Sequence, residues 1–416
     1  MMILYLLLVL IWTGLAVMCA AFPILGIGAL AFLSTLETER IPLPGAAIPL
    51  PAAALTVFLC SAGLRLALSR QIHREWLTGF VFLLASFLAS SLLCLHPDSA
   101  LQTTAAWLAY AAAAYFVGLY WPQPNLNPYV IFPFKACLLA ALFLAVFQIQ
   151  PWTVGTAPSA CGGFAEAGFF GIFLAWILPF ALVAFQQSDT SREEGWWAGI
   201  FLLGLGLGLM TGSRGAITLL FLTVTLCAAF RLINRELILW LAPLAAVALL
   251  HLLQGRDFGI GDTVTAGVRN IISPDFVERG LSALAVFAAH PFFGVGPGQY
   301  EAYLAWAYPE SAGPAGEPNS TLLRLLAETG ILGGLAFSWI GGRLFWGWYD
   351  AQRQSRFHSG ETRFLRAAFV SLTTLVMSFL IHGVHVHLFT WCFMGMLYGC
   401  FRDAGTMEPA DKSPEL

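Results

Sequence analysis

The feature that most constrains the fold is the succession of long apolar runs along almost the whole chain. A helix needs about 20 apolar residues to cross a bilayer, and such runs follow one another here with only short polar breaks. Only 10% of the residues are charged, whereas a soluble domain carries about 25%. A water-exposed surface cannot be built from this composition. The sequence therefore predicts an all-α, polytopic membrane helix bundle that forms a single integral membrane domain over residues 1–416.

The apolar runs predict about twelve membrane spans. Residues 2–34, interrupted by Pro23, are expected to be a retained tilted or hairpin-like segment, because they lack the basic start of a cleaved signal. A proline-rich loop is expected over residues 41–51. The remaining spans are expected near residues 51–68, 76–95, 100–120, 130–149, 164–186, 196–211, 213–230, 236–253, 320–345, 364–384 and 387–401.

The arginines predict the orientation of the bundle. Most of them fall on one side of the predicted spans, and the positive-inside rule makes that side cytoplasmic. The long segment 254–319 then forms an external loop with short interfacial helices, and residues 403–416 form a cytoplasmic polar tail. The arginines on the cytoplasmic side are Arg65, Arg70, Arg74, Arg192, Arg231, Arg235, Arg343, Arg353, Arg356, Arg363, Arg366 and Arg402.

Neither the cysteines nor the histidines predict a metal site. Nearly all eight cysteines lie inside apolar runs, which is typical of buried small hydrophobic residues. Three histidines, His382, His385 and His387, cluster at the outer end of the penultimate span. Their spacing is loose for a metal site, and no acid nearby completes one.

The stretch from His290 to Gly334 departs from the apolar pattern. It begins HPFFGVGPGQY, where Gly294, Gly296 and Gly298 predict a tight turn that lets the backbone approach a ligand closely. It ends in a helix for which Asn319 or Ser320 would be a suitable N-cap. The backbone N–H groups at such a helix start favour anions.

The two blocks HPFFGVGPGQY and NSTLLRLLAETGILG resemble the signature of the O-antigen ligase and polymerase family, whose members move glycans off undecaprenyl-pyrophosphate. The first block matches fully and the second in most positions, but the family's histidine before Asn319 is Pro318 here. The resemblance implies a fold like that of C-type membrane glycosyltransferases, in the bacterial cytoplasmic (inner) membrane with the active site facing the periplasm. The partners it implies are an undecaprenyl-pyrophosphate-linked glycan, a saccharide or lipid acceptor, and membrane lipids.

The substrate-binding residues are expected to be cationic groups and backbone turns at the outer face. Arg214, in TGSRGA, carries a guanidinium suited to bidentate binding of a diphosphate, although an arginine that merely snorkels at a helix end is the structural alternative. Arg279, on the first turn of a predicted amphipathic helix, could reach a phosphate at the membrane surface, or it is simply a solvated charge on that helix. The expected substrate-binding set is Arg214, Arg279, Arg324, Asn319, Gly294, Gly296 and Gly298.

Glycosyl transfer also needs a base that deprotonates the acceptor hydroxyl. With proline at position 318, the candidates are Glu301, Glu317 and the histidines His382, His385 and His387. Glu328 has two interpretations: it either forms an i,i+4 ion pair with Arg324 or acts as a catalytic group. Because arginines can neutralise a diphosphate, we expect neither a metal nor another cofactor, and no nucleic-acid partner.

Three alternatives remain open from the sequence. The enzyme is either a ligase or a polymerase. A transporter or lipid-linked oligosaccharide flippase is less favoured, because transporters often show repeated halves and this chain shows none. A non-catalytic member of the family is the third possibility.

Overall fold

The computed structural model describes twelve segments of the chain, together with Gly14 and Val17. These are residues 22–36, 40–43, 46–69, 74–94, 96–121, 132–148, 164, 166–211, 213–233, 274–307, 320–354 and 359–402. The predicted span 236–253 and the predicted tail 403–416 lie outside them.

The described residues form a helical bundle whose helices coincide with the predicted apolar runs. The proline at the start of α2 explains where that helix begins, since proline is favoured at the first helical position. The helices are α2 (Pro23–Ser34), α3 (Leu50–Ser69), α4 (Arg74–Leu93), α5 (Pro97–Tyr120), α6 (Phe132–Gln148), α7 (Ala167–Gln186), α8 (Ser191–Leu209), α9 (Arg214–Ala229), α12 (Pro274–Ala289), α13 (Tyr300–Ala307), α14 (Thr321–Gln354), α15 (Ser359–Ile381), the 3-10 turn η3 (Val384–Val386) and α16 (Leu388–Arg402).

The proline-rich segment that was expected to be a loop instead contains a small hairpin. Strands β1 (Arg40–Leu43) and β2 (Ala46–Pro49) pair antiparallel, with Ile41 opposite Ile48. A two-stranded sheet consists only of edges, where proline is tolerated because its missing N–H leaves no partner unsatisfied.

Five of the described helices, α3, α4, α7, α14 and α15, are long and apolar enough to cross a membrane by length and composition. The shorter α6 and α9 are also apolar. The chain is therefore an integral membrane protein. The count of about twelve spans and the external position of residues 254–319 stay predictions.

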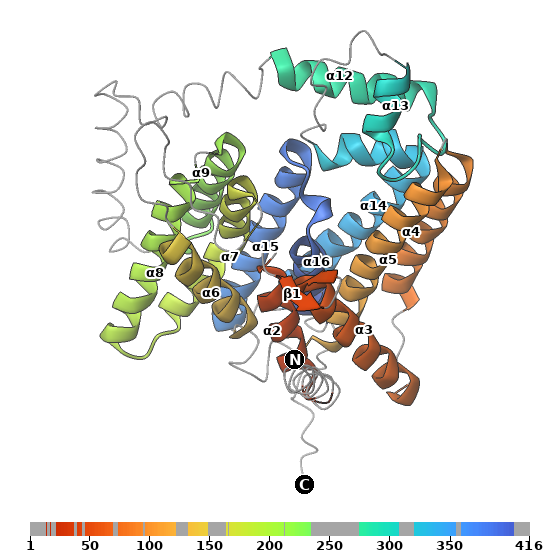
Figure 1. Cartoon of the computed structure of the whole chain (residues 1–416). Helices are drawn as coiled ribbons and strands as arrows, with labels where there is room; N and C mark the ends of the chain where they lie inside the picture. The colour runs from red at the N-terminus through yellow and green to blue at the C-terminus, as the bar shows by residue number, and fades with distance from the viewer. Residues whose placement is uncertain are drawn as a thin grey trace.

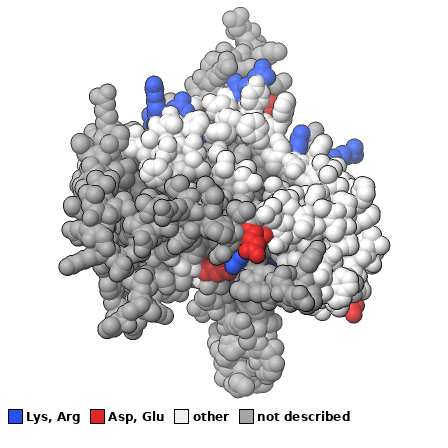
Figure 2. Space-filling view, turned by 90° about the horizontal axis from the view of Figure 1, so that it is seen from above, with Lys and Arg blue, Asp and Glu red and all other residues white. Residues whose placement is uncertain are grey.

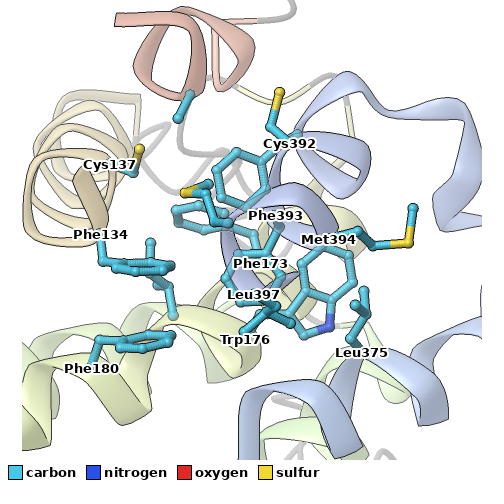
Figure 3. Packing of buried hydrophobic residues seen from close by; sticks show 14 of the residues in the cluster. Phe134, Cys137, Phe173, Trp176, Phe180, Leu375, Cys392, Phe393, Met394 and Leu397 are labelled. Carbon is cyan, nitrogen blue, oxygen red and sulfur yellow. The ribbon is translucent and has the colours of Figure 1, made fainter. Parts of the chain in front are cut away.

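The core of the bundle forms around α7, which is buried along almost its whole length. It packs against α8, α9 and α15. Aromatic rings fill the space between α7, α6 and α16: Phe134 stacks on Phe180 with ring centroids 3.9 Å apart, and Trp176 stacks on Phe393 at 5.6 Å (Figure 3). This packing fixes α7 relative to α6 and α16.

Three of the arginines expected at the cytoplasmic side cap helix ends at one end of the bundle. Arg402 donates to the carbonyls of Gly118 and Leu119, which end α5. Arg363 and Arg366 donate to the last carbonyls of α7 and α9. Helix C-termini carry partial negative charge, so these contacts are favourable.

The opposite end of the bundle carries residues 274–307, the described part of the segment expected to be external. Helix α12 lies across the top of the bundle, above α13 and the start of α14 (Figure 1). Ala283 and Val286 of α12 pack with Tyr300 of α13 and Ala327 of α14 in a second, smaller core. Among the described residues seen from above, most are uncharged; acidic side chains and a basic one meet near the middle, and further basic side chains stand along the upper edge of the view (Figure 2).

Candidate functional site

The segment from His290 to Tyr300 forms the tight turn that its glycines predict. Gly294, Gly296 and Gly298 have φ angles of 66°, 106° and 72°, a region that residues with a Cβ rarely adopt. The turn begins where α12 ends, with the N–H of Gly294 donating to the carbonyl of His290 at 3.0 Å. The exposed His290 also places its Nε2 3.1 Å from the Tyr303 hydroxyl, which fits a structural role.

Helix α14 is broken where this turn meets it. Gly330 has φ 65° and ψ −163°, so the helical hydrogen bonds stop there. The N–H of Val295 donates to the carbonyl of Ala327 at 3.0 Å, and that of Gly296 to the carbonyl of Glu328 at 2.8 Å. The turn thus satisfies backbone groups that the break releases, as a buried non-helical segment within a membrane protein requires.

The three glycines of the turn are packed against protein on the side where a Cβ would stand. At Gly294 that Cβ would fall on the main chain of Glu328, closer than real Cβ contacts occur. At Gly296 it would lie 2.6 Å from Cys94 Cβ, and at Gly298 2.7 Å from Thr103 Oγ1. Close contact with α14, α4 and α5 accounts for the glycines, so their expected substrate-binding role stays a prediction.

Arg324 and Glu328 form a buried ion pair one turn into α14. Arg324 Nε donates to Glu328 Oε1 at 3.0 Å, and the two residues are 8% and 0% exposed. The backbone N–H groups of Gly298 and Tyr300 also face the carboxylate of Glu328. The i,i+4 pairing expected from the sequence is present, and it connects α14 to the glycine turn.

Tyr300 lies among the charged side chains of this region. It is 1% exposed, and burial raises the pKa of its hydroxyl to about 12. The positive charge of Arg324 opposes this shift, the negative charges of Glu301 and Glu328 add to it, and Arg279 opposes it again. Arg279, Arg324 and Glu301 are therefore within electrostatic range of one buried group, although Glu301 itself is exposed.

The turn that carries the three histidines packs on the start of α14. Thr321 donates its N–H at 3.1 Å and its hydroxyl at 2.8 Å to the carbonyl of His382. Ser320 caps α14 by accepting the N–H of Leu323 at 3.3 Å. A Cβ added to Gly168 would lie 3.1 Å from Ser213 Oγ and 3.3 Å from His382 Nε2. The half-buried His382 therefore lies where α7, α9 and α14 all begin.

The other two histidines have different surroundings. His385 is 2% exposed, with Nδ1 3.3 Å from the Thr321 hydroxyl and its ring edge-to-face with Trp107. Burial and then the charge of Arg324 lower the pKa of His385 well below its usual range, so its ring is neutral. His387 stacks on Phe169 at 3.6 Å. Among the described residues, no group of three metal-ligating side chains is present.

The other predicted residues are placed only in part. Arg214 is the first residue of α9, directly after the N-cap Ser213, which accepts the N–H of Ala216 at 3.5 Å. Glu317, Pro318 and Asn319 lie outside the described residues. The sequence did not indicate Thr321, or the contribution of α4 and α5 through Ser90, Cys94 and Thr103, because no local pattern connects these helices to the glycine turn.

These features define an integral membrane protein with a polar, arginine- and histidine-bearing site among helix ends at one end of a helical bundle. Residues 199–338 match the family model described as O-antigen ligase. The family resemblance is thereby confirmed, and the chain carries an O-antigen ligase family domain over that segment. The match includes Arg214, Arg279, Arg324 and the glycine turn, but not the histidine turn. A search of curated proteins found no match to this chain.

Proposed function

We propose that this protein transfers a glycan from an undecaprenyl-pyrophosphate-linked donor to a saccharide or lipid acceptor at the outer face of the bacterial cytoplasmic membrane. The observation that carries the proposal is the meeting of the starts of α7, α9 and α14 with the histidine turn: Thr321 donates to the carbonyl of His382, and Ser213 and His382 both approach Gly168. The family match to an O-antigen ligase supports glycan transfer as the reaction.

The donor diphosphate is assigned to the arginines at these helix starts. Arg214 begins α9 and Arg324 lies in the first turn of α14. Helix N-termini favour anions because the helix dipole presents positive charge there. A guanidinium adds two parallel donors that match phosphate oxygens. Arg279, half-buried on α12, is the third candidate for this role.

The chemical step needs no covalent intermediate with the protein. The acceptor hydroxyl oxygen attacks the anomeric carbon, and the bond from that carbon to the diphosphate oxygen breaks. The diphosphate leaves with the electron pair, and the arginines stabilise its charge. The proton of the hydroxyl passes to a base. Since the arginines neutralise the leaving group, the proposal requires no metal ion.

Among the three histidines, His382 is favoured as that base. It is half-buried, and its Nε2 approaches Gly168, which is also approached by Ser213, the residue before Arg214. His385 is buried against Trp107 and His387 is covered by Phe169, so a large acceptor reaches them less easily. Glu301, exposed on the first turn of α13, and Glu317 are the carboxylate alternatives.

The test compares Arg214→Lys and Arg214→Ala with the wild type, using purified protein and a lipid-linked donor. Lysine keeps the charge and loses the two-pronged geometry, so transfer should fall by about ten- to a hundredfold if one to three kcal/mol of charged hydrogen bonding is lost. The alanine variant should be slower still. Arg192→Lys, at an exposed arginine at the other end of the bundle, is the matched control and should transfer normally.

Wild-type activity in Arg214→Lys would instead indicate a snorkelling arginine, since lysine snorkels equally well.

A second experiment distinguishes a ligase from a polymerase by profiling the glycans of a strain that lacks the protein. Loss of polymer length identifies a polymerase, whereas normal polymer left on the lipid carrier identifies a ligase.

A further inference from the structure

We infer that Glu328 is a positioning residue, which holds the Arg324 guanidinium and the start of α13 in one fixed arrangement. The inference rests on the proposed function, because it assigns Arg324 to the donor site. It depends on how the break in α14 and the glycine turn are built around this carboxylate.

The break and the turn form one joint of main-chain hydrogen bonds. Val295 and Gly296 donate to the carbonyls of Ala327 and Glu328, as described above, and Ile331 N–H donates to the carbonyl of Pro291 at 2.8 Å. The two partners also interlock sterically. A Cβ on Gly330 would fall on the main chain of Phe292, just as one on Gly294 would fall on that of Glu328. The turn can therefore hardly shift relative to α14 without breaking the joint.

Helix α4 closes the joint from behind. Ser90, which is 1% exposed, donates its hydroxyl to the carbonyl of Glu328 at 2.7 Å. That carbonyl thus accepts both the Ser90 hydroxyl and the N–H of Gly296. At the outer edge of the same turn, Gln299 Nε2 donates to Ser99 Oγ at 2.8 Å. Helices α4 and α5 therefore support the turn at two places.

The Glu328 side chain lies at the centre of this arrangement. Its carboxylate receives Arg324 Nε at 3.0 Å on one side and faces the N–H groups of Gly298 and Tyr300 on the other. A buried charge is tolerated only when it is paired and hydrogen-bonded. This contact restrains the Arg324 guanidinium through its Nε.

The same geometry argues against Glu328 as the catalytic base. Its exposed fraction is 0%, and it lies behind the glycine turn. An acceptor hydroxyl would have to displace the turn to reach it. The carboxylate thus acts on the reaction only through Arg324 and the turn.

The first test compares Glu328→Gln with Glu328→Ala, each purified as the full chain. Glutamine keeps an oxygen that accepts from Arg324 Nε, whereas alanine leaves the guanidinium without that restraint. Catalytic efficiency toward the lipid-linked donor should fall by less than roughly tenfold in Glu328→Gln and by on the order of a hundredfold in Glu328→Ala, the size expected for a charge-assisted hydrogen bond. The loss should appear mainly as a raised KM for the donor.

The second test reads the joint without using activity. Amide hydrogen exchange of residues 292–296 and 327–331 should accelerate in Glu328→Ala and in Ser90→Ala. Ser86→Ala is the matched control: Ser86 is a buried serine of the same helix, but it donates only to Leu83 within α4, at 2.7 Å. Exchange in Ser86→Ala should equal that of the wild type.

Two results would overturn the inference. Equal losses in Glu328→Gln and Glu328→Ala, confined to kcat, would make Glu328 a base. Unchanged exchange in both Glu328→Ala and Ser90→Ala would show that the carboxylate and the Ser90 hydroxyl do not maintain the joint. If the wild type itself transfers no glycan, the proposed function fails, while the exchange measurements still decide the positioning role.

Discussion

Replacing Gly330 with alanine tests the joint at its tightest point. Gly330 combines φ 65° with ψ −163°, a conformation that is essentially confined to glycine and costs a residue with a Cβ about 1–3 kcal/mol. The added Cβ would also fall on the carbonyl carbon and oxygen of Phe292. Main-chain atoms cannot rotate away as a side chain can, and overpacking of this kind costs about 1–3 kcal/mol.

Together the two effects place the loss of folding free energy at about 2–6 kcal/mol. We expect the melting temperature of the purified protein in detergent to fall by roughly 2–7 °C. Glycan transfer should fall with it at temperatures where the variant is still folded, because the joint aligns Arg324 with the turn.

The matched control is Gly341→Ala in the same helix. A Cβ on Gly341 meets nothing within 4 Å, and alanine in a helix interior is more stable than glycine by about 0.5–1 kcal/mol. Its melting temperature should therefore stay level or rise. A Gly330→Ala protein that melts within about 1 °C of the wild type would refute the reasoning, since even a loss of about 2 kcal/mol shifts a chain of this size by roughly 2 °C.

Two further predictions concern the base and the topology. His382→Ala should lower transfer by about 10²- to 10⁴-fold if this histidine deprotonates the acceptor; full activity after replacing all three histidines of the turn would leave the two glutamate candidates. Cysteines placed at Gly261 and Gly313 should react with an impermeant maleimide in intact cells, and one at Ser355 should not. The opposite labelling pattern would reverse the predicted orientation.

The sequence by itself determined the class of protein and the position of most helices. Apolar runs of span length leave few other folds, because the backbone polar groups of such segments must be paired within the membrane and a helix pairs them locally. The end of α12 before Pro291 and the i,i+4 pair of Arg324 and Glu328 are likewise local in origin. The two blocks that carry the family resemblance are also local, since each depends only on neighbouring residues.

The tertiary structure alone decided how these parts meet. Nothing in the run TLLRLLAETGILGG shows that the helix breaks at Gly330, because the hydrogen bonds that compensate for the break come from Val295 and Gly296. The support from Ser90 crosses 238 residues of sequence. The three histidines look equivalent in the sequence, and only packing against Thr321, Trp107 and Phe169 separates them. Contacts of this kind depend on the three-dimensional arrangement of distant helices, and local sequence patterns carry no record of them.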